Sequence, residues 1–552
     1  MSNALTRRKF IASSAVAAVA LVGSGYIGTA EGSTTEDTNW DDQADVVVLG
    51  FGAAGGAAAF YAAENGASVL ALESTSVPGG TTRISGGTCY FPNNALQKEA
   101  GIKDSKEKSI TYLKQIAMDQ ADDELIEAYV DLAPGVAAEI QQKTGIEWVL
   151  APYPDYHPEW EGGQRQGRSL NPKYGDKTSG NALMAGLYDA CIARGVRFAF
   201  NTKAYKLIQD DTGRVIGVIA QQANRTVKVR AHRGVVIATG GFEWDSKLGK
   251  HFLRGPVHSH VTLPGGHGEG LKMAMAVGAD LRNMNESWGL PVYLLPGWEE
   301  EVASFDAKKY QRSGWKKIIG DWFIYRTKPG TIIVNKEGKR FLNEAADYDS
   351  AQYGFLPRKT WGDGGWRNDK AYIIADATEW SKWAFAQIPA GSEPPEYVVK
   401  ADTLEELAEK LGIDPSGLTE TVTRFNKYAS QTVPTDPDFH RGESYFERAI
   451  GGDASISSVN PEDPRASLAP LTVAPYYGMP IYSGSCGTAG GPRVNRNAQV
   501  IDVFGNIIKG LYAAGNASGV GAPGGAYAGP GGTNGPAVVF GSQAGKTAAL
   551  DF

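Results

Sequence analysis

Apolar and polar positions follow two patterns along the chain. Apolar residues run almost without interruption over 44–49 and again over 67–73, and each run has the length of a strand. The alanine-rich segment 53–65 between them follows a glycine turn and has the length of a helix. These segments predict a β-α-β unit. Residues 205–238 instead alternate apolar and polar side chains around two turns, which predicts a small antiparallel meander.

The remaining elements are predicted by the same reasoning. Residues 232–242 form an apolar run that ends in a Thr-Gly-Gly turn, and residues 510–519 form another strand with a glycine turn. The C-terminal segment predicts a helix with Asn534 as its N-cap and Pro536 in its first turn. Between about 287 and 487, aromatic and proline-rich segments without a glycine fingerprint indicate a second domain.

Length and composition support a multidomain enzyme. At 552 residues the chain exceeds the roughly 250 to 300 at which one hydrophobic core stops growing. Its 69 glycines show no collagen-like period, which is typical of an α/β enzyme with many tight turns around a cofactor. A net charge of −7, without a basic stripe, argues against nucleic acid or an anionic membrane as the main partner.

The N-terminal segment resembles a twin-arginine export signal. Arg7 and Arg8 precede Phe10 and a modest apolar stretch, which ends in small residues at Ala30. A membrane anchor is the alternative, but a span needs about 20 strongly apolar residues and this stretch is shorter and rich in alanine. We therefore expect cleavage near Ala30 and a periplasmic or other extracytoplasmic location, with no need for membrane association.

The metal-binding residue types are sparse. Cys89, Cys191 and Cys486 are widely spaced without a C-x-x-C pair, so neither an iron–sulfur cluster nor a zinc site is expected, although one disulfide stays possible after export. His258 and His260 are the only close histidine pair, and such a pair indicates a surface loop more often than a metal site.

A glycine fingerprint lies between the first strand and the first helix. Gly50, Gly52 and Gly55 occupy its three positions, where missing side chains let a pyrophosphate approach the helix N-terminus. Glu73 ends the second strand, where it can bind ribose hydroxyls. The strand, helix and acid at these spacings together predict a bound dinucleotide.

Three more segments favour FAD over NAD. Small donors within 74–87 can follow a second phosphate and a flavin ring, and the turns after the later strands add two further contacts. The C-terminal helix would direct its positive end toward a reduced flavin. Because no histidine lies within 79–94, we expect noncovalent FAD. The predicted cofactor residues are Gly50, Gly52, Ala53, Ala54, Gly55, Glu73, Ser74, Gly80, Thr81, Thr82, Ser85, Gly86, Gly87, Ala204, Ala238, Thr239, Gly240, Gly515, Asn516, Asn534 and Gly535.

We thus predict an α/β fold in which a Rossmann-like FAD-binding domain is interrupted by an inserted α+β substrate-capping domain. The expected organisation is a signal peptide at 1–30, a polar linker at 31–42, the FAD-binding domain at 43–286 and 488–552, and the capping domain at 287–487.

The segment GAPGGAYAGPGGTNGPA (521–537) sets one tyrosine, Tyr527, among residues that have almost no side chains. Glycine is used where backbone approaches a partner closely, so the loop is predicted to wrap a ligand; a glycine-rich surface turn is the alternative.

The mature chain as a whole resembles the fumarate reductase and 3-ketosteroid dehydrogenase flavoproteins. GGTTRISGGTCYFPNN (79–94), the PDY and QGR motifs within 153–169, and GKRFLNEAADYD (338–349) are similar to motifs of the ketosteroid Δ1-dehydrogenases. In fumarate reductases an arginine stands where this chain has Tyr348. Alanine at 528, in place of the family's usual proline, is a departure.

The resemblance implies a noncovalent FAD enzyme that dehydrogenates a 3-ketosteroid. Tyr348 would take a proton from C2 with help from Tyr156, the flavin N5 would take hydride from C1, and Tyr527 with the Gly531 N–H would polarise the C3 carbonyl. Asn93 and Asn94 are expected to cap or brace a loop, and Glu344 to hold Arg340 or backbone.

Two other readings stay open. One is a different reaction at an activated alkene, such as ketosteroid Δ4-dehydrogenation or an enone or fumarate-type reduction. The other is a flavin-loaded steroid carrier without turnover, which would not need a base at Tyr348. A steroid substrate and an unidentified electron acceptor are the expected partners, with no metal and no nucleic acid.

Overall fold

The principal sheet is assembled from segments that lie far apart in the sequence. The computed structural model describes residues 39–308, 325–362, 364–385, 388–519 and 527–551, so the predicted signal peptide lies outside the described residues. Parallel strands β20, β10, β1 and β2 form the centre of this sheet in that order. Their bounds are Ile507–Ala513, Arg225–Ile237, Asp42–Leu49 and Val69–Leu72.

The edges of this sheet are made by the remaining strands. β7 (Arg197–Ala199) pairs with β2, and β19 (Gln499–Ile501) pairs with β20. β8 (Thr202–Gln209) and β9 (Val215–Gln222) pair antiparallel with each other, and β9 continues onto β10. The predicted β-α-β unit and meander are therefore confirmed. All four residues of β2 are buried, which explains its uninterrupted apolar run.

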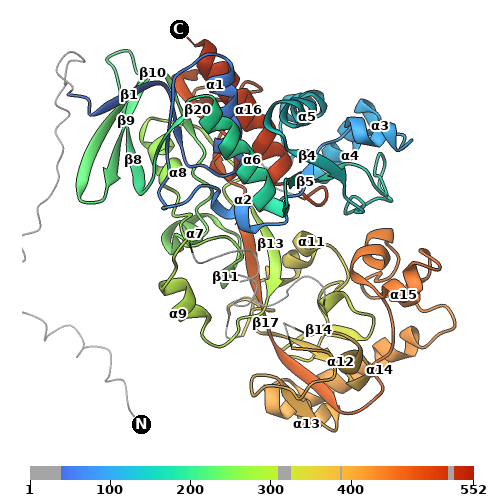
Figure 1. Cartoon of the computed structure of the whole chain (residues 1–552). Helices are drawn as coiled ribbons and strands as arrows, with labels where there is room; N and C mark the ends of the chain where they lie inside the picture. Colours follow the sequence, from blue (N-terminus) through green and yellow to red (C-terminus); the bar gives the residue numbers. More distant parts are fainter. Residues whose placement is uncertain (1–38, 309–324, 363, 386–387, 520–526, 552) are drawn as a thin grey trace, which may run out of the picture. The chain divides into compact units, whose positions relative to one another are not determined.

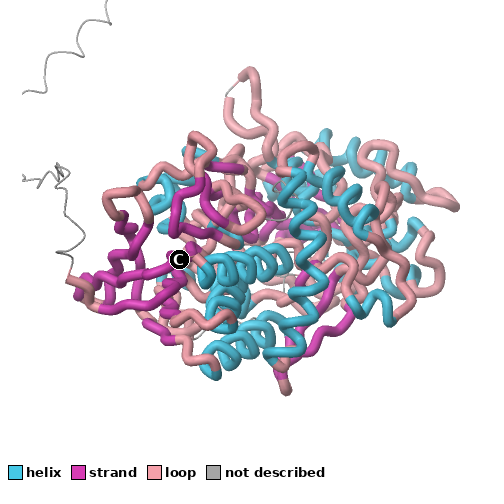
Figure 2. The backbone as a smooth tube through the Cα atoms, turned by 90° about the horizontal axis from the view of Figure 1, so that it is seen from above, coloured by secondary structure: helices cyan, strands magenta, loops and turns pink. Residues whose placement is uncertain are grey.

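Helix α16 (Asn534–Leu550) packs closely along α1 (Ala53–Glu64) near the C-terminus in Figure 1, and Figure 2 shows helices beside the C-terminus from above. A Cβ at Gly541 would stand 2.4 Å from the Ala54 carbonyl oxygen, and one at Gly545 would stand 2.2 Å from that of Ala58. The glycines of the last helix thus let two backbones meet beside the nucleotide fingerprint. Other helices of this part are α2 (Gly80–Ile84), α4 (Lys106–Ala117), α5 (Asp123–Thr144), α6 (Ser179–Ala193) and α8 (Glu269–Ala276).

A second sheet is centred on the long strand β17 (Tyr476–Thr488), drawn in orange-red in Figure 1. β17 pairs with β11, β13, β15 and β16, and β14 pairs with β15. These strands are Ser259–His260, Ser287–Val292, Ala371–Ala375, Val399–Ala401 and Thr331–Asn335. Helices α13 (Leu404–Leu411) and α14 (Pro415–Ala429) bury their apolar faces with residues of this sheet. β11 joins the second sheet although it precedes the predicted boundary at 286.

A smaller four-stranded sheet supports the loops of the site. It contains β3 (Cys89–Tyr90), β4 (Glu147–Leu150), β5 (Ser169–Tyr174) and β6 (Lys177–Thr178). The loop that connects the end of β4 to the start of β5 carries Tyr156.

The structure differs from three local expectations, which concern the N-cap of the last helix, the position of His260 and a possible disulfide. Thr533, not Asn534, is the N-cap of α16, because Asn534 is already helical and its amide donates to the Thr88 carbonyl at 3.2 Å. His260 is buried in β11 rather than exposed in a loop. All three cysteines are free.

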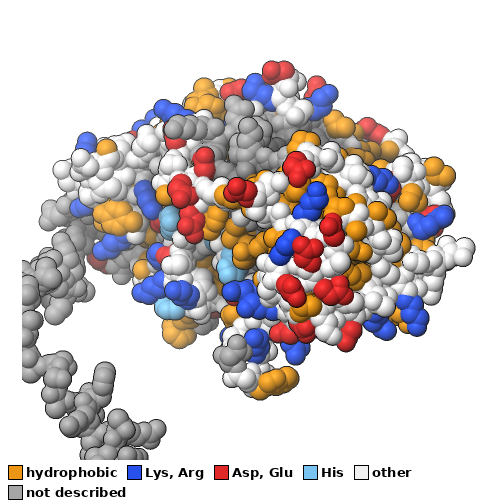
Figure 3. Space-filling model, turned by 90° about the horizontal axis from the view of Figure 1, so that it is seen from below, with side chains coloured by type: hydrophobic (Ala, Val, Ile, Leu, Met, Phe, Trp, Pro, Cys, Tyr) orange, Lys and Arg blue, Asp and Glu red, His pale blue; other side chains and the backbone are white. Residues whose placement is uncertain are grey.

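Among the described residues no group of three or more metal-type side chains could hold a metal ion, and none of their helices is long and apolar enough to cross a membrane. On the face shown in Figure 3, acidic and basic side chains are interspersed.

Candidate active site

Three tyrosines that are up to 371 positions apart in the sequence meet in one cluster. The ring centroid of Tyr156 lies 5.6 Å from that of Tyr348 and 5.6 Å from that of Tyr527. The rings of Tyr348 and Tyr527 are 5.3 Å apart. All three predicted catalytic tyrosines are buried and are brought together by the fold.

Apolar side chains surround the three rings. Trp288 presents an edge to Tyr527 with centroids 6.0 Å apart, and Phe446 stands against Tyr156 at 4.9 Å. The cluster is completed by buried and partly buried side chains, namely Leu290, Val292, Ala489, Val261, Leu294, Ile450, Tyr482 and Cys486. Polar groups that act here therefore work in a dry environment, where electrostatic interactions are stronger than in water.

Burial sets the protonation state of the tyrosines. It raises the pKa of Tyr156, Tyr348 and Tyr527 above the ordinary value for a phenol. A hydrogen bond between Tyr156 and Tyr348 lowers the pKa of Tyr156 and raises that of Tyr348. All three side chains are therefore neutral phenols near neutral pH, and each can donate a hydrogen bond.

A buried charge cluster fixes the segment that carries Tyr156. Arg168 forms ion pairs of 2.8 Å with both Asp155 and Asp104. Tyr90 donates to Asp155 at 2.9 Å. Because Asp155 directly precedes Tyr156, this cluster holds the backbone at the catalytic candidate. Sequence reasoning did not single out Asp155 or Arg168, although both lie in the PDY and QGR motifs.

The Tyr156 segment is joined to the glycine loop by its backbone. The Tyr156 N–H donates to the Ala528 carbonyl at 3.1 Å, and the Tyr112 hydroxyl donates to the same oxygen at 2.7 Å. Residues 520–526 of the loop lie outside the described residues, whereas Tyr527 is placed by these contacts beside Tyr156. The described part of the loop, from Tyr527 onward, therefore belongs to a buried cluster rather than to a surface turn.

Gly531 needs to be a glycine. Its φ is +91°, and a Cβ there would stand 2.7 Å from the Thr88 carbonyl oxygen. Its own carbonyl accepts from Tyr90 and Gly535 at 3.1 and 2.9 Å. In the described part of the chain its N–H donates to no acceptor. The second predicted donor for a substrate carbonyl is therefore available.

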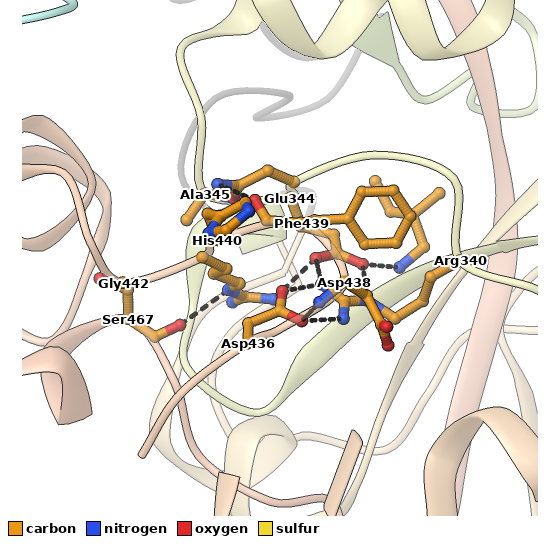
Figure 4. Close-up of polar contacts among 12 residues, drawn as sticks. Arg340, Glu344, Ala345, Asp436, Asp438, Phe439, His440, Gly442 and Ser467 are labelled. Carbon is orange, nitrogen blue, oxygen red and sulfur yellow. Dashed lines mark hydrogen bonds and ion pairs between the residues drawn. The ribbon is translucent and has the colours of Figure 1, made fainter. Parts of the chain in front are cut away.

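The segment that leads to Tyr348 carries a buried network of ion pairs around Arg340 and Glu344, shown in Figure 4. Arg340 donates to Glu344 at 2.9 and 2.6 Å and to Asp436 at 3.0 and 2.8 Å. Arg441 forms a 3.2 Å pair with the same Glu344 carboxylate. The arginines hold the pKa of Glu344 below its usual range although burial alone would raise it. The predicted contact between Glu344 and Arg340 is confirmed.

Tyr348 is also the first residue of the short helix α11 (Tyr348–Gln352). Asp347 caps this helix by accepting from the Ser350 N–H at 3.0 Å, and Asp349 accepts from the Gly289 N–H at 3.0 Å. These bonds fix Tyr348 relative to β13, which carries Trp288. Asn94 is confirmed as a capping residue, since it forms a capping box at the start of α3 (Ala95–Glu99).

The glycine fingerprint has the shape of a nucleotide cradle. A Cβ at Gly50 would stand 2.6 Å from the Ala238 carbonyl oxygen, and one at Gly55 would stand 2.0 Å from that of Gly50. Around Gly52 the nearest atom is the Thr82 hydroxyl at 3.8 Å, so space is left there. Two of the glycines thus let the turn close, and the third leaves room for a ligand.

Other predicted cofactor residues gather around this turn. Ala53 donates its N–H to the Thr82 hydroxyl at 3.2 Å, and a Cβ at Gly515 would stand 3.0 Å from that of Ala54. Thr239 has a buried hydroxyl without a partner among the described residues. Gly240 has a φ of +77° and nothing within 4 Å of its Cβ position. An unused buried hydroxyl beside open backbone fits a bound nucleotide.

Glu73 connects the fingerprint to the next strands. Its carboxylate accepts from the Phe51 N–H at 2.9 Å and from the Ser74 hydroxyl at 3.3 Å. The Glu73 carbonyl accepts from Thr202, two residues before Ala204. The acid therefore stands beside the glycine turn.

Positions 80–87 adjoin the start of α16. The Asn534 amide donates to the Ser85 hydroxyl at 3.5 Å, and the Ser85 hydroxyl accepts from the Gly87 N–H at 3.0 Å. Gly86 is exposed, and the Thr81 hydroxyl accepts from Leu263 rather than contacting the fingerprint. Gly80, another predicted position, is the first residue of α2. The Asn516 amide lies where a Cβ at Gly487 would stand only 2.4 Å away. At Gly535 a Cβ would stand 2.4 Å from the Tyr90 carbonyl oxygen.

Comparisons with known proteins agree with this geometry. The family model described as an FAD binding domain matches residues 45–533. The chain is 32% identical to 4-oxocyclohexanecarboxylate 2-dehydrogenase of Sinomonas cyclohexanicum, over 92% of each chain. It is also 32% identical to 3-oxosteroid 1-dehydrogenase of Mycobacterium tuberculosis, over 90% of this chain and 96% of that protein.

Among solved structures, the chain is similar to the 3-ketosteroid Δ1-dehydrogenase of Sterolibacterium denitrificans in complex with 1,4-androstadiene-3,17-dione. The identity is 28%, the TM-score is 0.83, and 93% of this chain and 100% of that chain are covered. The predicted α/β fold and the predicted FAD cofactor are thereby confirmed. The chain belongs to the FAD-binding-domain family and is a flavin-dependent oxidoreductase.

Proposed function

We propose that the protein dehydrogenates a 3-ketosteroid between C1 and C2. The observation that carries this proposal is the meeting of Tyr156, Tyr348 and Tyr527 in an apolar cluster, in which Tyr527 lies four residues before Gly531, whose N–H donates to no acceptor among the described residues. Such a cluster suits a neutral, rigid ketone that needs one proton removed beside its carbonyl.

The carbonyl end of the site is formed by Tyr527 and Gly531. The C3 oxygen would accept hydrogen bonds from the Tyr527 hydroxyl and the Gly531 N–H, and both bonds strengthen as the oxygen gains negative charge in the enolate. Because burial raises the pKa of Tyr527, the phenol keeps its proton and acts as a donor. Polarised in this way, the C2–H bond becomes acidic enough for a protein base.

The base is Tyr348, with Tyr156 as its hydrogen-bond partner. Tyr348 would act in its deprotonated form: the phenolate oxygen takes the C2 proton and becomes a neutral phenol, and a hydrogen bond from Tyr156 stabilises the phenolate beforehand. Bound FAD supplies the acceptor for the hydride that leaves C1. The residues of the glycine cradle would hold FAD, since Gly52 leaves open space and Thr239 has a buried hydroxyl without a partner among the described residues.

A smaller ketone that carries a carboxylate is the second candidate, because the chain is equally similar to a dehydrogenase named for such a substrate. The same tyrosines would serve it. However, Asp347 and Asp349 flank Tyr348, and the ring of His157 already lies 3.7 Å from the Asp347 carboxylate. A substrate carboxylate would therefore meet acidic side chains beside Tyr348, which favours the neutral steroid.

The test offers the purified holoenzyme a set of ketones together with an artificial electron acceptor. Androst-4-ene-3,17-dione, cholest-4-en-3-one and a bile-acid 3-ketone should gain a 1,2-double bond. 5α-Androstane-3,17-dione distinguishes the position, because a Δ4 enzyme converts it to the 4-ene. 4-Oxocyclohexanecarboxylate, and fumarate with a reduced donor, serve as competitors. Turnover of the carboxylate alone would refute the steroid proposal.

We also propose that the protein is exported by the twin-arginine route. This rests on Arg7, Arg8 and the apolar stretch up to Ala30. That route carries folded proteins, which suits a flavoprotein that is loaded with FAD in the cytoplasm.

A further inference from the structure

The hydroxyl of Tyr527 already has a partner within its own loop. It donates to the Thr533 hydroxyl at 3.1 Å. The tyrosine ring lies over the turn between them, since a Cβ at Gly532 would stand 3.1 Å from the ring. The Gly532 N–H closes this turn by donating to the Gly529 carbonyl at 3.0 Å. Glycine at 532 thus lets the side chain fold back until the two hydroxyls meet.

Thr533 does not do what a threonine at its position normally does. It is the N-cap of α16, where a threonine side chain usually accepts from the helix backbone and stabilises the helix. Here its φ and ψ are −93° and −48°, and its side chain makes no capping bond. The Thr533 hydroxyl contacts the Tyr527 hydroxyl instead. It therefore does not stabilise the first turn of α16 as a capping side chain would.

This contact can reverse its direction if a ketone binds to Tyr527. Without substrate, Thr533 accepts the Tyr527 proton. A carbonyl that takes this proton leaves the Tyr527 oxygen free to accept, and a threonine hydroxyl can turn to donate. The chain would then run from Thr533 to Tyr527 to the carbonyl oxygen, and each bond polarises the next. A hydrogen bond donated by Thr533 favours the deprotonated form of Tyr527. It accordingly lowers the pKa of Tyr527, although burial raises this pKa by a larger amount.

We propose that Thr533 is a positioning residue of the ketone site, which fixes the Tyr527 hydroxyl and strengthens it as a donor to the substrate carbonyl. The inference rests on the proposed function and deepens it. No bond to Thr533 is made or broken, and only hydrogen bonds are exchanged.

The test is a double-mutant cycle on the holoenzyme. Thr533→Val removes the hydroxyl at constant shape, and Thr533→Ser keeps it. Thr533→Val should lower kcat about tenfold, with a matching fall in solvent-deuterium exchange at C2 in the absence of an electron acceptor. Thr533→Ser should stay close to the wild type. In a Tyr527→Phe background, Thr533→Val should add no further loss, because its effect passes through the Tyr527 hydroxyl.

Equal losses in both backgrounds would show that Thr533 only supports the helix, and an unchanged Thr533→Val enzyme would equally overturn the inference. Flavin absorbance and Tm verify that each variant is folded. The same four proteins can also be compared by their affinity for androst-4-ene-3,17-dione, measured through changes in the flavin absorbance, which requires no turnover. A wild type that neither binds nor converts any ketosteroid would refute the proposed function itself, and this result is recognised before any variant is made.

Discussion

Tyr348 is the residue whose substitution should separate binding from chemistry. Its ring packs against Tyr156 and Tyr527, and only its hydroxyl is required as a base. Tyr348→Phe should therefore retain FAD and steroid but lose at least about a hundredfold in kcat. Steady-state rates and steroid binding measure the two effects. Tyr353→Phe, an exposed tyrosine on the same segment, is the control. Wild-type turnover in Tyr348→Phe would contradict its role.

The pH dependence of the reaction follows from the same side chain. Burial raises the pKa of Tyr348 above the ordinary phenol value of about 10, so the base is protonated at neutral pH. The deprotonated fraction then grows about tenfold per pH unit. We expect kcat/KM to rise with pH and to be still rising near pH 10 for as long as the protein stays folded. A plateau below pH 8 would point to a different base.

Tyr527 distinguishes a ketone site from a loop that only wraps the flavin. Tyr527→Phe should lower kcat and kcat/KM together by about a hundredfold, the pattern of a bond that strengthens in the transition state. Exchange of the C2 proton with solvent should fall as well, since it requires enolisation but no hydride transfer. If both measurements stay at wild-type values, the carbonyl is held elsewhere.

At the scale of elements, the segment before Tyr348 is tied to the chain around 442–447 by Glu447. Asn343 donates to this carboxylate at 2.7 Å, and burial raises its pKa from 4.5 to about 7. The folded state therefore binds more protons than the unfolded state between these pH values, and the free energy of unfolding falls as pH rises from about 4.5 to 7.

We expect Glu447 to contribute about 3 kcal/mol to this fall. Urea unfolding at pH 5 and pH 8 measures it. Glu447→Gln should remove that part of the difference, and substitution of an exposed glutamate, Glu409→Gln, should not. The same pH difference in all three proteins would show that Glu447 does not titrate in this way.

At the scale of the whole molecule, the cradle predicted to hold the cofactor gathers residues that lie between positions 50 and 535 of the sequence. The purified mature protein should be yellow, should release its flavin on acid precipitation, and should begin shortly after Ala30. Flavin analysis of the supernatant and N-terminal sequencing check these points. FMN, flavin that stays with the precipitate, or an intact N-terminus on exported protein would each contradict one part of the prediction.

The sequence by itself determined the local elements. The β-α-β unit, the meander and the C-terminal helix follow from apolar periodicity and from glycine turns, which depend on neighbours a few residues away. The motifs also indicated Tyr156, Tyr348 and Tyr527. Their roles stay predictions, but the fold does bring them together.

Only the tertiary structure decided which side chains are in contact and how far they are buried from water. Asparagine is a common N-cap residue, but the Asn534 amide donates hydrogen bonds to Ser85 and Thr88. Thr533 is therefore the N-cap of α16. His260 is buried because β11 pairs with β17, more than 220 residues later. The raised pKa of each tyrosine likewise comes from distant apolar segments. Burial and hydrogen-bond partners are properties of packing between remote parts of the chain, and local sequence does not contain them.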